Sequence, residues 1–455
     1  MQLINPANGQ VFREVDEDTT ETISEKIHHL KRVQEEWAAV PVKERLGIIS
    51  TFGKLVKAQR ETLAQWLTQE TGKPIQQARN EVTGAHNRIA HLQKHAEKWL
   101  AEELLEKEGS TQELIRYEPL GVIANISAWN FPYNIGYNVF LYALVAGNAV
   151  AYKPSEHALL TGFGFKSLLE EAGLPKGLFE VIVGKGEVGE TLLKADIDGC
   201  FFTGSYATGK KIATQLAGRM IPLQLELGGK DPLYVMEDVR DIKQAAKNAA
   251  EGAFYNNGQS CCAVERIYVH ASIYEEFLDQ FLEEVRSYTL GDPLDETTFI
   301  GPLTRKDQPS FLFGQVKDAL EKGATLHCGG KIPNRPGFYF EPAVLSEVNH
   351  EMELMREESF GPIIGIQRVE GDKEAAKLMA DTNYGLTAAV FSQDKNRALQ
   401  LLDRLNVGTV YWNCCDRVSP NLPWSGRKQS GVGSTLSYQG IRVFTQPKAY
   451  QLREG

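Results

Sequence analysis

The first hundred residues carry apolar side chains at intervals of three and four, the period of a helix that is buried along one face. Three stretches follow this pattern: residues 23–40, 43–72 and 81–104. The pattern then changes to alternating apolar and polar residues over 112–127, interrupted at Glu118-Pro119. The sequence therefore predicts three leading helices followed by a pair of strands.

From residue 148 onward, short runs rich in β-branched and aromatic residues alternate with helical segments. In a first series, strands are predicted at 148–154, 178–184, 199–204 and 221–228, with helices at 157–173, 187–195 and 207–218. In a second series, strands are predicted at 265–271, 388–394 and 408–413, with helices at 242–255, 274–287 and 398–405. Such alternation is typical of βαβ units, whose parallel sheet is covered by helices on both faces. An α/β protein with two doubly wound halves is predicted. The halves meet near 226–229, where a site is expected.

Length and composition narrow the classes of protein. A chain of 455 residues exceeds one compact core, so two or three domains are expected. The 49 Lys and Arg against 59 Asp and Glu give a net charge of −10 without a long basic run, which argues against a nucleic acid partner. No window approaches the roughly 18 consecutive apolar residues of a membrane helix, and the N-terminus lacks the pattern of a signal peptide. We expect a soluble, unprocessed chain with no membrane partner.

Six cysteines are present, and four of them form the vicinal pairs Cys261/Cys262 and Cys414/Cys415. This is not the dense, even framework of secreted domains, so a reducing cytoplasm is expected. Vicinal cysteines also lack the C-x₂₋₄-C spacing of structural zinc sites, and no metal is expected. The local sequence leaves Cys261 open between a reactive thiol and a packed one, because free cysteine is among the most buried residue types.

Three turns that follow predicted strands offer places for a nucleotide. Residues 184–189 have the order G-x-G-x-x-G between a strand and a helix, but no acid follows about 20 residues later, so a tight turn is the competing interpretation. Gly204 and Ser205 precede a helix whose first N–H groups would suit an anion. Lys153 and Glu156 end another strand and are able to hydrogen-bond a ribose diol, although a solvated strand end has the same composition.

Six motifs stand in a fixed order along the chain. They are SAWNFP (127–132), KPSE (153–156), FTGS (202–205), LELGGKDP (225–232), GQSC (258–261) and EESFGP (357–362). In order, spacing and chemical character the set resembles the aldehyde dehydrogenase superfamily, and the resemblance covers nearly the whole chain. It implies an aldehyde dehydrogenase-like fold of two parallel-sheet domains with a small β oligomerisation extension. The expected parts are a dinucleotide-binding domain of 1–102 and 120–227, a catalytic domain of 228–435, and oligomerisation strands within 103–119 and 436–455.

The resemblance assigns the chemistry to three side chains. Cys261 matches the nucleophile that adds to the aldehyde carbon, and Cys262 is a neighbour at a position where the family varies. Asn130 matches the side-chain donor to the oxyanion, beside the backbone N–H of Cys261. Glu226 matches the general base that activates water for thioester hydrolysis. The implied activity is NAD(P)-dependent oxidation of an aldehyde to a carboxylic acid through a thiohemiacetal and a thioester on Cys261.

The resemblance also implies a cofactor-binding set. It comprises Lys153, Ser155 and Glu156 at the adenosine ribose, Gly184 at the adenine pocket, Gly204 and Ser205 at the pyrophosphate, Leu227 and Gly228 close to the thiol, and Glu358 and Phe360 at the nicotinamide ribose and ring. The carboxylate of Glu156 would repel a 2′-phosphate. NAD is therefore expected as the preferred cofactor, with NADP as the alternative.

The substrate tunnel is expected at Phe131, Asn134, Asn138 and Trp424. The two asparagines indicate polar contacts. Trp424 would offer an aromatic face to a cationic amine, whereas Arg417 would offer a basic anchor to the carboxylate of a semialdehyde. The small-molecule aldehyde is therefore left unassigned between polar, amino- and semialdehyde substrates.

Two other functions compete with this interpretation. An enzyme that releases its thioester to coenzyme A would not be expected to keep a base such as Glu226. A non-enzymatic protein, structural or acting through thiol redox chemistry, has no need of Cys261, Asn130 and Glu226 together. The resemblance also implies that strands near 103–119 and 440–455 leave the body of the subunit and pair with a neighbour, and both segments have the alternation this requires, so a homodimer or homotetramer is expected.

Overall fold

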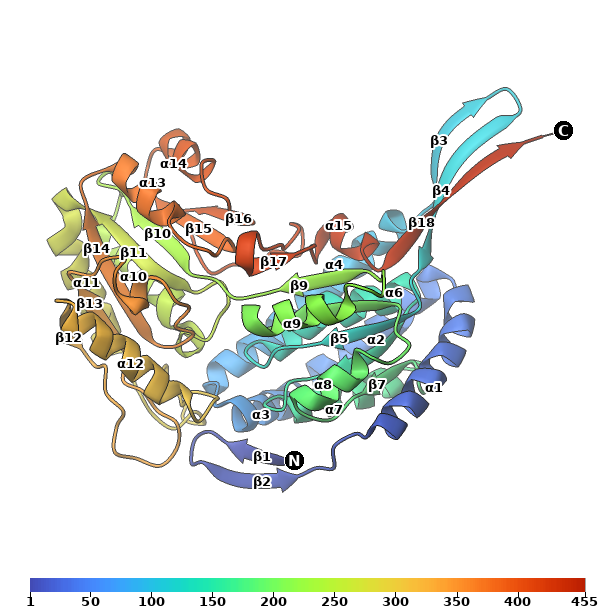
Figure 1. Ribbon diagram of the computed structural model, residues 1–455, viewed down its shortest axis with the longest axis horizontal. Helices are drawn as coiled ribbons and strands as arrows, with labels where there is room; N and C mark the ends of the chain where they lie inside the picture. Colours follow the sequence, from blue (N-terminus) through green and yellow to red (C-terminus); the bar gives the residue numbers. More distant parts are fainter. Residues whose placement is uncertain (455) are drawn as a thin grey trace.

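Two sheets of mainly parallel strands organise the chain, and a small antiparallel sheet extends away from them (Figure 1). The computed structural model describes residues 1–454. The strands of the first sheet are β5 (Val122–Ile126), β6 (Ala149–Lys153), β7 (Phe179–Val181), β8 (Gly199–Thr203), β9 (Leu223–Glu226) and β17 (Gly431–Val432). They lie in the order β17-β9-β8-β5-β6-β7.

β5 comes first of these strands in the chain and lies inside the sheet. The chain adds β6 and β7 on one side of it and then β8 and β9 on the other, all parallel. The crossing helices are α7 (Leu159–Glu171), α8 (Gly186–Leu192) and α9 (Tyr206–Leu216). The central strands are buried along nearly their whole length, which explains their continuous apolar runs. In doubly wound sheets, ligands bind beyond the carboxyl ends of the strands where the order reverses, here between β5 and β8.

Four helices, rather than the three expected, precede this sheet. They are α1 (Thr20–Ala39), α2 (Val42–Ala58), α3 (Arg60–Thr71) and α4 (Ile75–Trp99). The expectation of one helix over 43–72 is wrong because the backbone of Gln59 leaves the helical conformation, with φ −100° and ψ 15°. Neither glycine nor proline stands at this break, so the apolar period runs through it without a local signal.

The second sheet begins at residue 231. Its strands are β10 (Asp231–Val235), β11 (Val264–His270), β12 (Thr325–Cys328), β13 (Ala343–Ser346), β14 (Ile363–Val369), β15 (Thr387–Phe391) and β16 (Thr409–Trp412). Their order is β12-β13-β14-β11-β10-β15-β16, with β12 antiparallel to β13 and the other pairs parallel. The helices of this half are α10 (Ile242–Phe254), α11 (Tyr274–Ser287), α12 (Gln308–Glu321), α13 (Asp372–Ala380) and α14 (Lys395–Leu402). The predicted α/β fold with two parallel-sheet halves is confirmed.

The two sheets are joined at the end of β9. The chain runs from the carboxyl end of β9 through residues 227–230 into the amino end of β10. β17 returns from the second half and pairs antiparallel with β9, placing Gly431 opposite Glu226. The carboxyl edge of the first sheet therefore meets the amino edge of the second at this crossing.

The third sheet stands out from the body at the upper right of Figure 1. It consists of β3 (Glu103–Glu108), β4 (Thr111–Pro119) and β18 (Thr445–Arg453), in the order β18-β4-β3 and antiparallel throughout. β18 follows the short helix α15 (Ser437–Arg442). Leu104, Leu105 and Leu452 are exposed on this extension. A further hairpin of β1 (Gln2–Asn5) and β2 (Gln10–Glu14), which was not expected, begins the chain.

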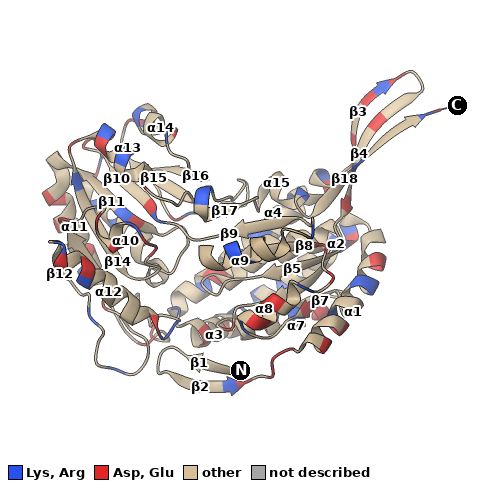
Figure 2. Ribbon diagram, viewed as in Figure 1, with Lys and Arg blue, Asp and Glu red and all other residues tan. Residues whose placement is uncertain are grey.

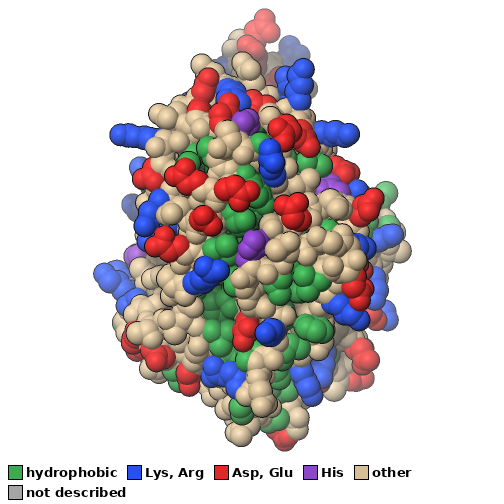
Figure 3. Space-filling model, turned by 90° about the vertical axis from the view of Figure 1, so that its left-hand side faces the viewer, with side chains coloured by type: hydrophobic (Ala, Val, Ile, Leu, Met, Phe, Trp, Pro, Cys, Tyr) green, Lys and Arg blue, Asp and Glu red, His purple; other side chains and the backbone are tan. Residues whose placement is uncertain are grey.

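Charged residues of both signs are mixed over the helices and the extension (Figure 2). Figure 3, which shows the molecule from the end occupied by the second half, has basic and acidic side chains interleaved with apolar ones. In the chain described here, no helix is both long and apolar enough to cross a membrane.

Candidate active site

A cavity of about 530 Å³ lies between the two halves of the protein. The four expected tunnel residues, Phe131, Asn134, Asn138 and Trp424, all line it. Both thiols of the vicinal pair at 261–262 line the same cavity, as do Cys414 and Cys415. The structure therefore brings the expected tunnel and the expected nucleophile together, although they are distant in sequence.

Cys261 is held on the loop that connects the short 3₁₀ turn Tyr255–Gly258 to β11, and it is half-buried. Asn256 and Asn257 in this turn have left-handed backbones, with φ of 54° and 57°, a conformation that asparagine tolerates better than most residues. Gly258 follows with φ 68°, and a Cβ there would lie 2.4 Å from the carbonyl oxygen of Gly361. The tight loop thus places the thiol of Cys261 at the cavity wall.

Cys262 has a different environment from its neighbour. Its side chain is buried, and its Sγ donates to Oδ1 of Asp416 at 3.1 Å. The hydrogen bond with Cys261, together with burial and the nearby carboxylate of Asp416, raises the pKa of the Cys262 thiol well above its ordinary value. A thiol that keeps its proton is a poor nucleophile, so the structure favours Cys261 over Cys262 for attack.

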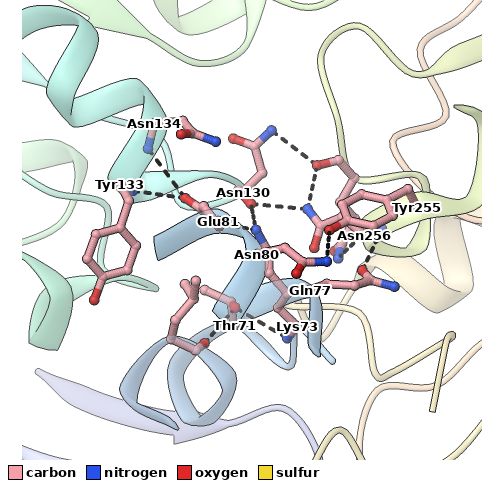
Figure 4. Close-up of polar contacts among 12 residues, drawn as sticks. Thr71, Lys73, Gln77, Asn80, Glu81, Asn130, Tyr133, Asn134, Tyr255 and Asn256 are labelled. Atoms are coloured by element: carbon pink, nitrogen blue, oxygen red, sulfur yellow. Dashed lines mark hydrogen bonds and ion pairs between the residues drawn. The ribbon is translucent and has the colours of Figure 1, made fainter. Parts of the chain in front are cut away.

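Asn130 lies on the loop after β5, and its side chain reaches the loop that carries the thiol (Figure 4). Its Nδ2 donates to the carbonyl oxygen of Gln259 at 3.1 Å, two residues before Cys261. The carbonyl oxygen of Asn130 accepts from Nζ of Lys73 at 2.7 Å and from Nδ2 of Asn256 at 3.1 Å. The side-chain amide of Asn130 is therefore held by Gln259, and its backbone by Lys73 and Asn256, before any substrate binds, as an oxyanion donor requires.

Lys73 and Glu81 form a buried ion pair under this loop. Glu81 Oε1 accepts from the backbone N–H of Tyr133 at 2.9 Å, and the ammonium of Lys73 lies 3.8 Å from the ring centre of Phe131. Burial lowers the pKa of Lys73, while the carboxylate of Glu81 opposes this effect. The pair connects α4 to both the expected oxyanion donor and the expected tunnel, and neither residue was among the expected site residues.

Glu226 ends β9 and is buried. Its Oε1 accepts from Nε2 of Gln224 at 3.0 Å, and its Oε2 is buried without a partner among the described residues. Burial raises the pKa of Glu226 well above its ordinary value, although the hydrogen bond from Gln224 acts to lower it. A carboxylate with a raised pKa and a free oxygen is suited to accept a proton from water.

The expected cofactor residues gather at the carboxyl ends of the same sheet. Ser155 Oγ donates to Oε2 of Glu156 at 3.1 Å, just beyond β6. Burial acts to raise the pKa of Glu156, but His157, backbone hydrogen bonding and Lys153 outweigh it and lower that pKa. Burial lowers the pKa of Lys153. An ionised carboxylate beside a buried ammonium fits a ribose diol, which both donates and accepts hydrogen bonds.

Ser205 caps α9, with its Oγ accepting from the N–H of Thr208 at 3.3 Å. The N–H of Gly204 donates to the carbonyl oxygen of Glu226 at 3.0 Å, which ties this turn to the end of β9. The start of an 11-residue helix beside the crossing of the sheets fits a pyrophosphate. Gly184 lies in the turn between β7 and α8. Its φ is +154°, and a Cβ there would lie 2.3 Å from Val188, so close packing accounts for this glycine.

Glu358 and Phe360 lie just before β14 and reach the crossing from the other half. The N–H of Gly229 donates to Oε1 of Glu358 at 3.0 Å. A Cβ on Gly228 would lie 2.3 Å from Oε2 of Glu358, so any larger residue at 228 would require the carboxyl group of Glu358 to move. Burial and then the charge of Glu265 raise the pKa of Glu358 to about 8. Leu227, beside this glycine, is buried.

A second buried ion pair, Lys230 with Glu265 at 2.5 Å, holds this segment. Glu265 accepts from the N–H groups of Ser359 at 2.8 Å and Phe360 at 2.9 Å. Phe360 has φ +48°, an uncommon conformation for an aromatic residue, and its ring meets Trp129 edge-on at 5.5 Å. The pair therefore supports the strained backbone that carries the expected ring-flanking residue.

Arg88, on α4, also lines the cavity and was not anticipated from the sequence. Its Nε and Nη1 donate to Oδ1 of Asn138 and Asn134, both at 2.8 Å. Asn138 lies in a five-residue π-helical turn (Tyr137–Leu141), a wide turn that is frequent at functional sites. Arg417, the expected basic anchor, lines the cavity as well but is exposed. Gln77, Glu81 and Arg88 fall on one face of α4 and form a polar stripe, which is a signal that the sequence contains.

Comparison with known proteins agrees with this geometry. The model of the aldehyde dehydrogenase family matches residues 1–450. Betaine aldehyde dehydrogenase 1 of Rhizobium meliloti (strain 1021) is 35% identical over 461 residues, covering 100% of this chain and 94% of the relative.

Two solved structures are also similar. A betaine aldehyde dehydrogenase from Staphylococcus aureus in complex with NAD+ has a TM-score of 0.94 and 32% identity, covering 100% of this chain and 92% of the other. An NADP-dependent enzyme from E. coli has a TM-score of 0.96 and 29% identity, covering 100% of this chain and 94% of the other. The chain, matched along nearly its full length in sequence and in fold, belongs to the aldehyde dehydrogenase family.

Proposed function

We propose that this enzyme oxidises an aldehyde to a carboxylic acid with NAD(P) and water, using Cys261 as the nucleophile, Asn130 as the oxyanion donor and Glu226 as the base. The observation that carries the proposal is the cavity of about 530 Å³. Cys261 lines its wall, Asn130 bonds to the same loop, and Glu226, at the end of β9, has a buried Oε2 without a partner among the described residues. These are the groups that acyl transfer through a thioester requires.

The first stage forms a covalent bond between enzyme and substrate. The thiolate of Cys261 adds to the carbonyl carbon, and the carbonyl oxygen becomes an oxyanion. Nδ2 of Asn130 donates to this oxygen, and its position is preset by the contacts of Gln259 and Lys73. A single donor of this kind contributes about 10²–10³ in rate. When bound, the nicotinamide supplies the acceptor for the hydride that leaves this carbon.

The second stage releases the acid. Glu226 takes a proton from water, whose oxygen attacks the thioester carbon. The bond between carbon and Sγ of Cys261 then breaks, which regenerates the thiolate and frees the carboxylic acid. The unpartnered Oε2 of Glu226 and its raised pKa support this role, and they favour hydrolysis over transfer to coenzyme A.

The proposed cofactor set is the one expected from the sequence, and the residues fit a dinucleotide. The ionised carboxylate of Glu156 supports NAD over NADP, because it would repel a 2′-phosphate. The solved relatives are known with both cofactors, the Staphylococcus aureus enzyme with NAD+ and the E. coli enzyme with NADP. We assign NAD as the preferred cofactor and NADP as the alternative.

Three further assignments belong to this proposal. The domains are 1–102 with 120–227 for the dinucleotide and 228–435 for catalysis. The strands of 103–119 and 436–455 pair with a second subunit in a homodimer or homotetramer, which the exposed leucines of the extension support. A cytoplasmic location is supported by six cysteines that are all free.

The test is a panel of aldehydes assayed with NAD and with NADP, following the absorbance of the reduced cofactor. We expect turnover with NAD, slower turnover with NADP, and loss of turnover in Cys261→Ser but not in Cys262→Ala. Added coenzyme A should not change the product from the free acid to an acyl thioester. Full turnover by Cys261→Ser, or no oxidation of any aldehyde, would contradict the proposal.

A further inference from the structure

We propose that Arg88 binds a carboxylate on the far end of the aldehyde, so that the preferred substrates are semialdehydes with a terminal carboxylate rather than cationic or neutral aldehydes. The inference rests on the proposed function, because it concerns the substrate of the same cavity. It goes further by naming the chemical class of that substrate and the residue that selects it.

Arg88 is a buried cation, 8% exposed, that lines the cavity. Its two observed hydrogen bonds go to the neutral amide oxygens of Asn134 and Asn138. Among the described residues, no carboxylate forms an ion pair with it. Burial lowers the pKa of Arg88, and the carboxylate of Glu81, which is already paired with Lys73, offsets this effect only in part. A buried charge without a counterion is costly, and an anionic ligand would relieve that cost.

The two asparagines beside Arg88 provide further hydrogen-bond donors. Because Asn134 and Asn138 turn their Oδ1 atoms toward Arg88, each keeps its Nδ2 as a donor. The guanidinium itself has five N–H donors in a planar fork that matches a carboxylate. This wall of the cavity therefore combines a fixed positive charge with amide donors, a combination that suits an anion and repels an ammonium group.

Two acidic residues, Asp416 and Glu251, line the same cavity. Oδ1 of Asp416 accepts from Ser260 at 3.0 Å and from Cys262 at 3.1 Å, so these neighbours already bind the oxygen. Burial raises the pKa of Asp416, which reduces the negative charge that it carries. Glu251 and the basic lining residue Arg417 are both exposed, so water screens their charges. The buried part of the cavity is therefore governed by Arg88.

The experiment compares three aldehydes of equal chain length that end in a carboxylate, a methyl group or a trimethylammonium group. The wild-type enzyme should have the highest kcat/KM for the carboxylate, by about 10–100-fold over the methyl compound, as expected for hydrogen bonds to a charged group. The trimethylammonium compound should be the poorest. A wild-type preference for the trimethylammonium or methyl compound would overturn the inference.

Variants locate the preference at Arg88. Arg88→Met should lose the carboxylate preference, measured as the ratio of kcat/KM for the carboxylate to kcat/KM for the methyl compound, and the loss should arise mainly through KM for the carboxylate because a uniform binding interaction is removed. Arg88→Lys should keep part of the preference, since the charge remains without the planar fork. Arg79→Met is the matched control, because it removes another guanidinium of α4 whose partners are the surface residues Glu61 and Glu296.

A rescue measurement keeps the inference testable if Arg88→Met changes the shape of the cavity. Added methylguanidinium should restore oxidation of the carboxylate compound in Arg88→Ala and leave the methyl compound unaffected. An unchanged carboxylate preference in all Arg88 variants would overturn the inference. If the methyl compound is oxidised but the carboxylate is not preferred, this inference fails while the proposed function stands. If no aldehyde is oxidised, the proposed function itself fails.

Discussion

The buried pair of Lys73 and Glu81 offers the most direct test of how the fold positions the active site. The perturbation is Lys73→Met, which keeps the length of the side chain and removes its charge. It deletes the ion pair with Glu81, the 2.7 Å bond to the carbonyl oxygen of Asn130 and the contact 3.8 Å from the ring centre of Phe131. The carboxylate of Glu81 would then be left buried without its cation.

The magnitude follows from these contacts. Both side chains are 1% exposed, so the unpaired carboxylate gains little from water. Breaking a buried ion pair costs about 3–5 kcal/mol of unfolding free energy. In Lys73→Met/Glu81→Gln no charge is left, and a glutamine oxygen still accepts from the N–H of Tyr133, so about 2 kcal/mol of this loss should return, within the range of coupled neighbours. The carbonyl oxygen of Asn130 loses the Lys73 donor in both the single and the double variant. kcat should therefore fall in Lys73→Met and should not recover in Lys73→Met/Glu81→Gln.

The assay is a double-mutant cycle of Lys73→Met, Glu81→Gln and their combination. Urea unfolding followed by tryptophan fluorescence reports the stability, and steady-state kinetics with one aldehyde and NAD report kcat. The reasoning is refuted if Lys73→Met costs less than about 1 kcal/mol, well under the cost of an unpaired buried charge. It is also refuted if the double variant is as unstable as the sum of the single ones, or if kcat is unchanged throughout.

Three more outcomes are expected at the site. Glu226→Gln should release one equivalent of reduced cofactor rapidly and then turn over about 10²–10⁴-fold more slowly, since a general base contributes that much; stopped-flow absorbance measures both phases. The raised pKa of Glu226 also means that hydrolysis loses rate as the pH falls, and this dependence should disappear in Glu226→Gln, so a retained pH limb would argue against its role as the base. Gly228→Ala should weaken binding of NAD, measured by fluorescence titration, because its Cβ would meet Glu358 at 2.3 Å, and unchanged affinity would count against the close approach.

Much of the fold was readable from the sequence, since period and turn chemistry are local properties. Alternating helical and β-branched segments predicted the two parallel sheets, and the positions of β6, β8 and α11 agree closely with the expected ranges. The break between α2 and α3 at Gln59 was missed because no residue there resists a helix, so packing alone decides it. The hairpin of β1 and β2 was missed as well, because its strands of four and five residues give little alternation to detect.

The residues of the proposed chemistry could be named from their motifs, but what orients them could not. Short motifs with a recognisable turn or strand context contain Cys261, Asn130 and Glu226. Such motifs can be identified from the amino-acid order without the structure. Lys73 and Arg88 act on residues 46 or more positions away, and nothing local marks those partners. The α/β pattern and the motifs that name the proposed reacting groups could be read from the amino-acid order alone. Packing placed the buried charges of Lys73, Glu81 and Arg88 beside those groups and the cavity, because a charge removed from water needs a partner, and only the folded chain brings distant partners together.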